Sequence, residues 1–342
     1  MFRYLIVGSG YRAKFYGRIA HEHPAQFEAC FLTRSSEKAA LMKEETGIDA
    51  VVDKEAAIAF QPDAVVIAVN KTAIASVGEE WLKEGYPVIL ETPAGLTNEE
   101  LETLWNYYRQ GAKILVAEQY HRMPEIAAGL EVIRQGLIGA PTSAYLSLAH
   151  DYHGASLLRR VLSTDGESYT IQAIRSVSSG EETDSRNGPI TSGVMNDHTR
   201  TQALITYASG KTAVYDFCGL QYHSFIRSRH ITGRGETGEW SDTCLRYVDE
   251  THQPATVPLE PLVQEKYRAL WSGPLPSWSP ALVLDRTSDE FAIKTMLWDM
   301  KEYLTTSREV YPFKEAIEDA LFLIKLEESV ERGCPVEAEP FV

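Results

Sequence analysis

Short apolar runs separated by segments with helical periodicity occupy the first 120 residues of the chain. The apolar runs are residues 4–7, 27–36, 64–70, 88–91 and 113–120. Helical spacing between them is clearest at residues 72–85 and 98–111. Continuous apolar runs, unlike runs that alternate with polar residues, are typical of parallel strands buried on both faces. The pattern therefore predicts a doubly wound parallel sheet with helices on both sides.

The first of these strands leads into a glycine turn. The stretch GSGYRA at residues 8–13 follows the strand and enters a helix, which makes it a G-x-G-x-x-A form of the dinucleotide fingerprint. In this fingerprint Gly8 permits the tight turn, Gly10 lets the backbone approach a pyrophosphate, and Ala13 allows close packing. An ordinary strand-to-helix turn is the alternative, but the position at the start of the chain favours a cofactor site. The predicted cofactor contacts are Gly8, Ser9, Gly10, Tyr11, Arg12 and Ala13.

The second strand ends in Thr33, Arg34 and Ser35, at the place where an acidic residue would bind the ribose of NAD. An arginine flanked by hydroxyls suits the 2'-phosphate of NADP, which a carboxylate would repel. NADP is therefore expected in preference to NAD. The other interpretation is that Arg34 is a solvated loop arginine, because a single position carries the argument.

Ligands of doubly wound sheets bind beyond the carboxyl ends of the strands. Two further strand ends should therefore border the cofactor. They carry Val69, Asn70 and Lys71 after one strand, and Glu91 and Thr92 after the next. Tyr120, at the end of the last apolar run, belongs to the same edge.

From residue 141 the pattern changes to long runs rich in aromatic and β-branched residues. Residues 141–153 and 211–232 are the clearest examples. This composition is typical of half-buried sheet strands. A chain of 342 residues is long enough for two domains, each with its own core.

Composition narrows the class of partner and the compartment. A formal net charge of -15 disfavours binding to a phosphate backbone, so no nucleic acid is expected. No apolar run approaches the roughly 20 residues of a membrane span. The N-terminus lacks the features of a signal peptide, so a cytoplasmic protein is expected. The histidines and cysteines show no metal-ligand spacing, and no metal is predicted.

Four passages have the order and character of one known family. They are IVGSGYRA at 6–13, PDAVVIAVN at 62–70, GYPVILETPAGLT at 85–97 and AEQYHRMPEIAAGLEVIRQGLIGAPTSAYLSL at 117–148. Together they resemble the glucose-fructose oxidoreductase, inositol dehydrogenase and MocA (Gfo/Idh/MocA) family. The resemblance implies an NAD(P)-binding Rossmann domain over residues 1–120 and an α/β domain over residues 121–342. The second domain would have a largely antiparallel, open-faced sheet that binds a small sugar-like substrate and packs against its counterpart in a homo-oligomer.

Three positions depart from the pattern of this family. Thr92 stands where the family's Glu-Lys-Pro motif has a lysine that helps to position or protonate the reacting oxygen. A threonine hydroxyl carries no charge and does not titrate near neutral pH. Ile74 replaces a usual histidine, and Ser156 replaces the aspartate of a His-x-x-Asp helix whose histidine matches His153.

One hypothesis is an oxidoreductase with altered acid-base residues. His153 is then the best proton donor, because histidine titrates near neutrality. Asp151, Tyr120 and His121 are supporting candidates, and Lys71 could supply the charge that Thr92 lacks. The alternatives are a packed or helix-capping His153, a solvated Lys71, and packing roles for Tyr120 and His121.

The other hypothesis is a sensor or regulatory subunit of the same fold that binds the nucleotide without hydride chemistry. It predicts cofactor binding without turnover of any sugar-like compound. Fold alone cannot separate the two hypotheses, because function depends on the site.

Overall fold

The computed structural model of the chain describes residues 1–185, 188–270, 279 and 282–341. The chain folds as two compact units. The first combines Met1–Gln119 with Asp289–Ala320, and the second combines Tyr120–Ser288 with Leu321–Val342. The division of function at residue 120 stays a prediction. The hydrophobic pattern does not indicate that Asp289–Ala320 joins the first unit.

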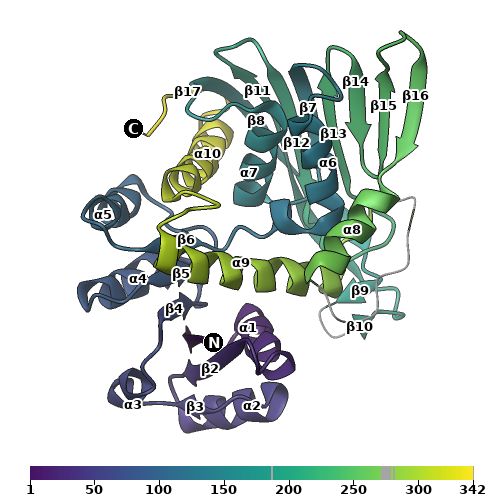
Figure 1. Cartoon of the computed structure of the whole chain (residues 1–342). Coiled ribbons are helices and arrows are strands. Elements are labelled where there is room, and N and C mark those ends of the chain that lie inside the picture. The colour runs from purple at the N-terminus through teal and green to yellow at the C-terminus, as the bar shows by residue number, and fades with distance from the viewer. Residues whose placement is uncertain (186–187, 271–278, 280–281, 342) are drawn as a thin grey trace. The chain divides into compact units, whose positions relative to one another are not determined.

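A six-stranded parallel sheet forms the first unit, in the order β3-β2-β1-β4-β5-β6 (Figure 1). Its strands are β1 Phe2–Val7, β2 Phe27–Leu32, β3 Ala50–Val51, β4 Ala64–Ile67, β5 Val88–Leu90 and β6 Ile114–Val116. Its helices are α1 Tyr11–Glu22, α2 Ser36–Thr46, α3 Lys54–Ala59, α4 Ile74–Lys83 and α5 Asn98–Arg109, with a short 3-10 turn, η1, at Lys71–Ala73. This strand order reverses direction between β1 and β4, where dinucleotides bind in such sheets. The predicted doubly wound domain is confirmed.

Burial on both faces explains the continuous apolar runs. Tyr4, Leu5 and Ile6 follow one another in β1 and so point to alternate faces, yet each is 0% exposed. Local signals fix the helix ends. For example, Thr97 and Glu100 form a capping box at the start of α5.

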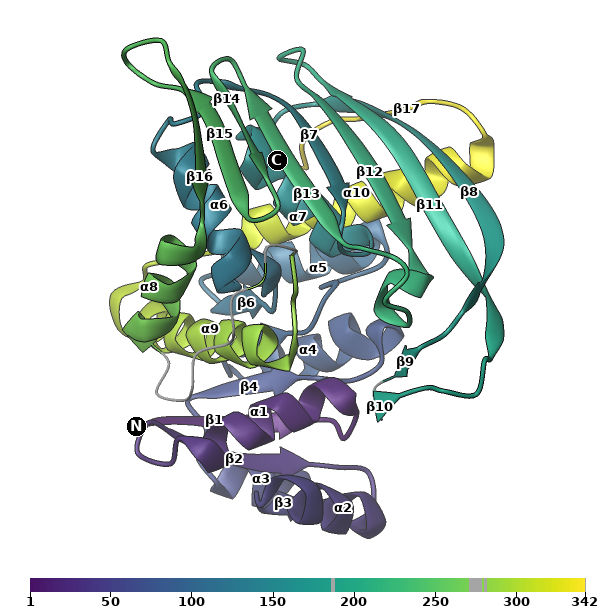
Figure 2. The same cartoon turned by 90° about the vertical axis from the view of Figure 1, so that its right-hand side faces the viewer.

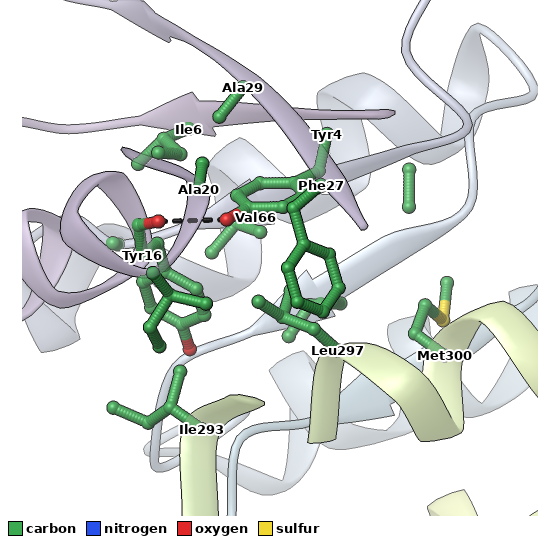
Figure 3. Close-up of a cluster of buried hydrophobic side chains, with 14 of the residues drawn as sticks. Tyr4, Ile6, Tyr16, Ala20, Phe27, Ala29, Val66, Ile293, Leu297 and Met300 are labelled. Atoms are coloured by element: carbon green, nitrogen blue, oxygen red, sulfur yellow. Dashed lines mark hydrogen bonds between the residues drawn. The ribbon is translucent and has the colours of Figure 1, made fainter. Parts of the chain in front are cut away.

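Helix α9 (Arg286–Thr306) completes the core of the first unit from a distant part of the chain. Ile293 and Leu297 of this helix pack in one cluster with Tyr4 and Phe27 of the sheet (Figure 3). Within the cluster the Tyr4 hydroxyl donates to the carbonyl of Tyr16, at 2.8 Å, so its buried polar end is satisfied.

The second unit is built on a nine-stranded sheet in the order β16-β15-β14-β13-β7-β12-β11-β8-β17 (Figure 2). The strands are β7 Pro141–Ser147, β8 Tyr169–Glu181, β11 Met195–Tyr207, β12 Thr212–Cys218, β13 His230–Gly235, β14 Gly238–Ser241, β15 Cys244–Val248, β16 Pro254–Pro258 and β17 Val336–Ala338. A separate pair is β9 Asp184–Ser185 with β10 Gly188–Pro189. Only β7 and β12 pair in parallel among the described strands of the large sheet, so it is largely antiparallel, as expected.

Helices cover one face of this sheet. The helical elements are η2 Tyr120–Arg122, α6 Pro124–Arg134, α7 Asp151–Leu162, η3 Gly219–Tyr222, α8 Glu260–Leu270 and α10 Phe313–Arg332. Gly129 of α6 lies against Trp240, and Gly154 of α7 lies against Tyr215, so both helices approach the strands closely. The end of α10 also belongs here, because Ser329 accepts from the amide of Ala173 at 2.9 Å.

Two expected strand runs are interrupted. The run 141–153 is a strand only to Ser147, and α7 begins at Asp151. Leu148 and Ala149 are buried in the corner between them, so the apolar pattern reports burial and not pairing. The run 211–232 breaks at η3 because the Gln221 side chain takes the place of ladder partners: it accepts from Cys218 N–H at 3.0 Å and donates to the Ser147 carbonyl at 2.7 Å.

Candidate functional site

Gly8 forms the turn between β1 and α1, and the structure accepts only glycine there. Its φ is +136°, a region that side-chain-bearing residues rarely adopt. A Cβ at Gly8 would lie 2.1 Å from the carbonyl oxygen of Ala68, just beyond β4. The turn is therefore held tightly against the point where the strand order reverses.

Gly10 caps α1 and leaves space in front of the helix. Its backbone is extended, with φ -83° and ψ -177°, and glycine has no side chain to accept from the first helical amides. In the described part of the chain, apart from the adjoining residues and the helix itself, no heavy atom lies within 4 Å of a Cβ built on Gly10. The first turn of α1 carries no acidic residue. An open, positively polarised helix start fits the pyrophosphate of a dinucleotide.

The other fingerprint residues divide between the surface and the core. Ser9 is half-buried, and Tyr11 is 41% exposed with its ring against Phe15. Ala13 is fully buried, as close packing of α1 on the sheet requires.

Arg12 lies in a polar network of the first unit. Its guanidinium is 3.1 Å from the carboxylate of Asp289 and 3.9 Å from that of Glu91. The same group stacks over the ring of Phe15 at 5.1 Å. Arg12 therefore joins the α1 start to the end of β5 and to α9, which is a structural role that the fingerprint alone does not reveal.

Glu91 is bound on the other side by Tyr16. The Tyr16 hydroxyl donates to Glu91 Oε1 at 2.6 Å, and burial, followed by the charge of Glu91, raises the pKa of Tyr16 well above its usual value. Thr92, next along the chain, is half-buried and joined to Pro93 by a cis peptide bond. A carboxylate that is largely shielded from solvent, with tyrosine and arginine partners, is well suited to hold this turn in place.

The predicted 2'-phosphate position lies at the start of α2. Thr33 is buried and its hydroxyl donates to the Ser35 carbonyl at 3.1 Å. Ser35 caps α2 by accepting from Lys38 N–H at 3.4 Å, and Arg34 is exposed. Arg34 is thus the member of this trio whose side chain extends into solvent.

The residues after β4 form hydrogen bonds within one short turn. Asn70 caps the η1 turn by accepting from the amide and hydroxyl of Thr72, at 3.1 and 3.0 Å. Val69 is half-buried and Lys71 is exposed at the start of the same turn.

The second unit brings together a cluster of aromatic polar groups. The hydroxyls of Tyr120 and Tyr222 are 3.1 Å apart, and the Tyr222 hydroxyl is 3.1 Å from His150 Nδ1. The ring of Phe217 flanks both His150 and Tyr222. Sequence reasoning selected Tyr120 but missed His150 and Tyr222. The histidine pair in HDYH at 150–153 is a local signal for His150, whereas Tyr222 has none.

His153 and Asp151 lie in the first turn of α7, beside this cluster. His153 is 4% exposed, and its ring centroid is 4.7 Å from that of Tyr120 and 5.0 Å from that of His150. Asp151 has a positive φ of 36°, and its amide donates to the Tyr215 hydroxyl at 2.8 Å. His153 is therefore a packed member of the cluster, and Asp151 fixes the start of the helix.

The electrostatic surroundings of His121 differ from those of the cluster formed by Tyr120, Tyr222 and His150. Its pKa falls well below the usual value, first because the ring is buried and then because of the nearby Arg160, Arg122 and Arg159. It is neutral at physiological pH and therefore a poor proton donor.

In the part of the chain that the structure describes, no three or more His, Cys, Asp or Glu side chains gather as metal ligands. No helix of those residues combines the length and apolarity needed to cross a bilayer.

Comparison with known proteins agrees with the geometry of the first unit. Residues 2–119 match the family described as "Oxidoreductase family, NAD-binding Rossmann fold", under the name GFO_IDH_MocA. The match covers the glycine turn, both flanking strand ends and the Glu91 turn. A search of curated proteins finds no match.

Solved structures resemble the whole chain in fold. An oxidoreductase from Agrobacterium radiobacter, in complex with NAD+, L-tartaric acid and magnesium, is 15% identical with a TM-score of 0.73, and the match covers 98% of each chain. Levoglucosan dehydrogenase in complex with NADH and levoglucosan is 17% identical with a TM-score of 0.73, covering 98% of this chain and 99% of that one. Biliverdin reductase from Synechocystis sp. PCC 6803, in complex with biliverdin and NADP+, is 16% identical with a TM-score of 0.64, covering 96% and 99%. At these identities the likeness is one of fold.

Proposed function

We propose that this chain, which belongs through residues 2–119 to the Gfo/Idh/MocA oxidoreductase family, is a cytoplasmic NADP-dependent oxidoreductase of a small, polar, sugar-like hydroxyl or carbonyl compound. The observation that carries the proposal is the glycine turn. Gly8 is sterically obligatory, and Gly10 opens the space in front of α1 in which a pyrophosphate fits.

The cofactor would be held by the residues of the first unit that the sequence proposes for this role. They are Gly8, Ser9, Gly10, Tyr11, Arg12, Ala13, Thr33, Arg34, Ser35, Val69, Asn70, Glu91 and Thr92. Bound there, the nicotinamide supplies reversible two-electron transfer as hydride. Among the protein groups, the amides at the α1 start bind phosphate, while Arg12 and Glu91 hold the turn after β5 against α1.

The preference for NADP depends on Arg34. The exposed guanidinium of Arg34, at the capped start of α2, suits a 2'-phosphate. The acidic residue in the first turn of that helix is Glu37. Arg34→Asp should weaken NADPH binding at least about 10-fold and leave NADH binding nearly unchanged. Arg109→Asp, the same charge change at another exposed position, is the control. Equal affinity of the wild type for the two cofactors would refute the preference.

Acid-base chemistry is assigned to the cluster of the second unit. His153 remains the proposed proton donor from the sequence, supported by Tyr120 and Asp151, and Lys71 is a candidate from the first unit. His153 is 4% exposed and packs against the rings of Tyr120 and His150, which are hydrogen-bonded to Tyr222.

The decisive experiment measures binding and turnover separately. NADPH binding is followed by fluorescence titration, and NADPH oxidation is followed at saturating cofactor with a panel of small carbonyl compounds, including keto-sugars. Tight NADPH binding with turnover of a panel member supports the proposal. No binding of either NADPH or NADH would refute it.

A nucleotide sensor is the second candidate function, and one observation favours it. Glu91 is bound by Tyr16 and Arg12, and Thr92 next to it brings no positive charge. This function predicts NADPH binding with no oxidation of NADPH by any member of the panel.

A homo-oligomer through the second sheet completes the proposal. The face of the sheet opposite α6 and α7 exposes neighbouring apolar residues, with Ile174 62%, Leu204 52% and Val214 39% exposed. Leu204 is paired with Val214, and Ile174 is paired with Gln202 on the same face. Light scattering should report a dimer or larger, and Leu204→Glu should shift it towards the monomer.

A further inference from the structure

Two ion pairs join helix α1 to the start of α9 within the first unit. The Arg12 guanidinium is 3.1 Å from the carboxylate of Asp289. The Arg18 guanidinium is 3.0 Å from the carboxylate of Glu290. Both guanidinium groups stack on the ring of Phe15, at 5.1 and 4.4 Å from its centre. The two pairs therefore join the same helices with the same kinds of group, and they differ in their position along α1.

Arg12 lies in the first turn of α1, whereas Arg18 lies six residues further along, or about 9 Å at the rise of an α-helix. The backbone amide of Arg12 is one of those that have no acceptor inside the helix. These amides form the proposed pyrophosphate site. The pair of Arg12 with Asp289 is therefore beside that site, and the pair of Arg18 with Glu290 is farther from it.

The side chain of Arg12 is engaged by neighbours in the first unit. Its Nε is 3.9 Å from a carboxylate oxygen of Glu91, and its Nη1 is 3.1 Å from one of Asp289. When the Gln119 amide is oriented so that both of its atoms are bonded, its oxygen accepts from Nη2 at 3.0 Å and its nitrogen donates to the Ala117 carbonyl at 2.8 Å. A phosphate at the helix start would therefore meet the backbone amide of Arg12, while its guanidinium is held by these groups.

The charges of this cluster do not cancel. The single positive charge of Arg12 faces the two carboxylates of Glu91 and Asp289, whose side chains are 12% and 20% exposed. Both carboxylates lie within reach of one arginine side chain from the helix start, a length comparable with the Debye length of about 8 Å at physiological ionic strength. The excess negative charge therefore repels a pyrophosphate bound at the α1 start.

We propose that Asp289 limits the affinity of the protein for its nicotinamide dinucleotide. It adds the excess negative charge, and it holds the Arg12 guanidinium towards α9. Asp289 is thus a positioning residue outside residues 2–119, which match the family. The proposal rests on the cofactor binding of the function above. An upper limit on affinity favours exchange of the spent cofactor for a fresh one, and release steps limit the turnover of many enzymes.

Asp289→Asn tests the proposal, because it removes the charge and keeps the shape of the side chain. Fluorescence titration at low ionic strength should show the dissociation constants of NADPH and NADH falling by about 3- to 10-fold. The gain should be equal for the two cofactors, because both contain the pyrophosphate. It should fall below about twofold in about 1 M NaCl, where the Debye length is about 3 Å. A purely structural role would not produce this salt dependence.

Glu290→Gln is the matched control, because it breaks the neighbouring ion pair between the same two helices. It should change the affinity for either cofactor by less than about twofold, since its charge lies farther from the helix start. Asp289→Glu keeps the charge and should also stay within about twofold of the wild type. A gain in Glu290→Gln as large as that in Asp289→Asn would overturn the specific role of Asp289.

The outcomes separate this inference from the proposed function. If the wild type binds NADPH and a folded Asp289→Asn binds it equally or more weakly, the inference is wrong and cofactor binding stands. If the wild type binds neither NADPH nor NADH, the proposed function itself fails. Should Asp289→Asn not fold, Asp289→Ser takes its place and the same results decide. Tighter binding without any turnover would support the role of Asp289 and remove only the hydride chemistry.

Discussion

The glycine turn of the first unit and the His150 cluster of the second differ in how far apart their parts lie in the sequence. Gly8 and Gly10 belong to one turn of a few residues, and glycines at this spacing indicate a cofactor site. His150 and Tyr222 are 72 residues apart, and Tyr120 and Tyr222 are 102 residues apart. A functional site can be recognised from the sequence when the backbone of one short segment forms it. It cannot be recognised when side chains from distant segments assemble it.

Substitution of Gly8 and Gly10 tests the site that the backbone forms, and it has the largest expected effect. Gly8→Ala combines a positive φ with a Cβ 2.1 Å from a backbone oxygen, so unfolding free energy should fall by about 3–5 kcal/mol. Gly10→Ala, with an ordinary φ and open space, should change it by less than about 1 kcal/mol. Its methyl group would occupy the pyrophosphate space, so NADPH affinity should fall at least about 10-fold.

Urea unfolding and NADPH titration of both variants make this check. If Gly10→Ala binds NADPH like the wild type, the space in front of α1 is not the phosphate site. If Gly8→Ala is as stable as the wild type, the turn is looser than its geometry implies.

The distinction between local and distant parts also explains what the sequence could predict. Strands β1, β2, β4, β5 and β6 and helices α4 and α5 follow from the apolar runs, because burial on both faces leaves a local trace. The two-residue strand β3, at Ala50–Val51, is not among those runs. The covering of the same sheet by α9 does not follow, since Ile293 and Leu297 show that they are buried but not what they are buried against.

The same limit applies to the candidate site. His153 was identifiable as an ionisable residue near a strand-to-helix corner, but its 4% exposure depends on Tyr120 and His150 packing around it. Arg12 similarly belongs to the fingerprint by sequence, and only the fold brings Asp289 to 3.1 Å from it.

Tyr16→Phe tests a contact between the helix that follows the glycine turn and a residue far along the chain. It removes the 2.6 Å hydrogen bond to the Glu91 carboxylate, 75 residues away, and leaves the aromatic packing intact. Loss of a bond to a charged group with little exposure should cost about 1–3 kcal/mol of unfolding free energy, measured in urea. Tyr247→Phe, which removes the hydroxyl of a half-buried residue on β15, is the control and should change stability by less than about 0.5 kcal/mol. Equal stability of the two variants would show that the hydrogen bond from Tyr16 is not needed to stabilise the Glu91 carboxylate.

Thr97→Ala tests a feature that is local in both sequence and structure. The Thr97 hydroxyl accepts from Glu100 N–H at 3.2 Å, and the Glu100 carboxylate accepts from Thr97 N–H at 3.2 Å. Breaking this capping box should cost about 1 kcal/mol in thermal or urea unfolding. Thr97→Ser should be close to the wild type, because serine caps equally well; a loss as large as that of alanine would mean that the threonine methyl group, and not the cap, matters.

The smallest expected effect comes from a distant polar contact and depends on pH. Glu125, in the first turn of α6, accepts from Tyr267 at 2.8 Å and from Ser288 at 3.3 Å, from 142 and 163 residues away. Burial raises the pKa of Glu125 above its usual value, and the two hydrogen bonds only partly oppose this. A carboxyl group with a raised pKa in the folded state contributes stability below its unfolded pKa, which is lost as pH rises through the folded pKa.

Glu125→Gln removes this titration and keeps the shape of the side chain. It should therefore gain stability relative to the wild type between pH 4 and pH 7, by a few degrees of melting temperature at most, with the difference vanishing at about pH 4 and below, where the wild-type carboxyl is protonated. Glu331→Gln, at an exposed position on α10, should show no such pH-dependent gain. A constant difference across the pH range would mean that the amide disturbs the hydrogen bonds to Tyr267 and Ser288, and that charge burial at Glu125 is not what limits the stability of this contact.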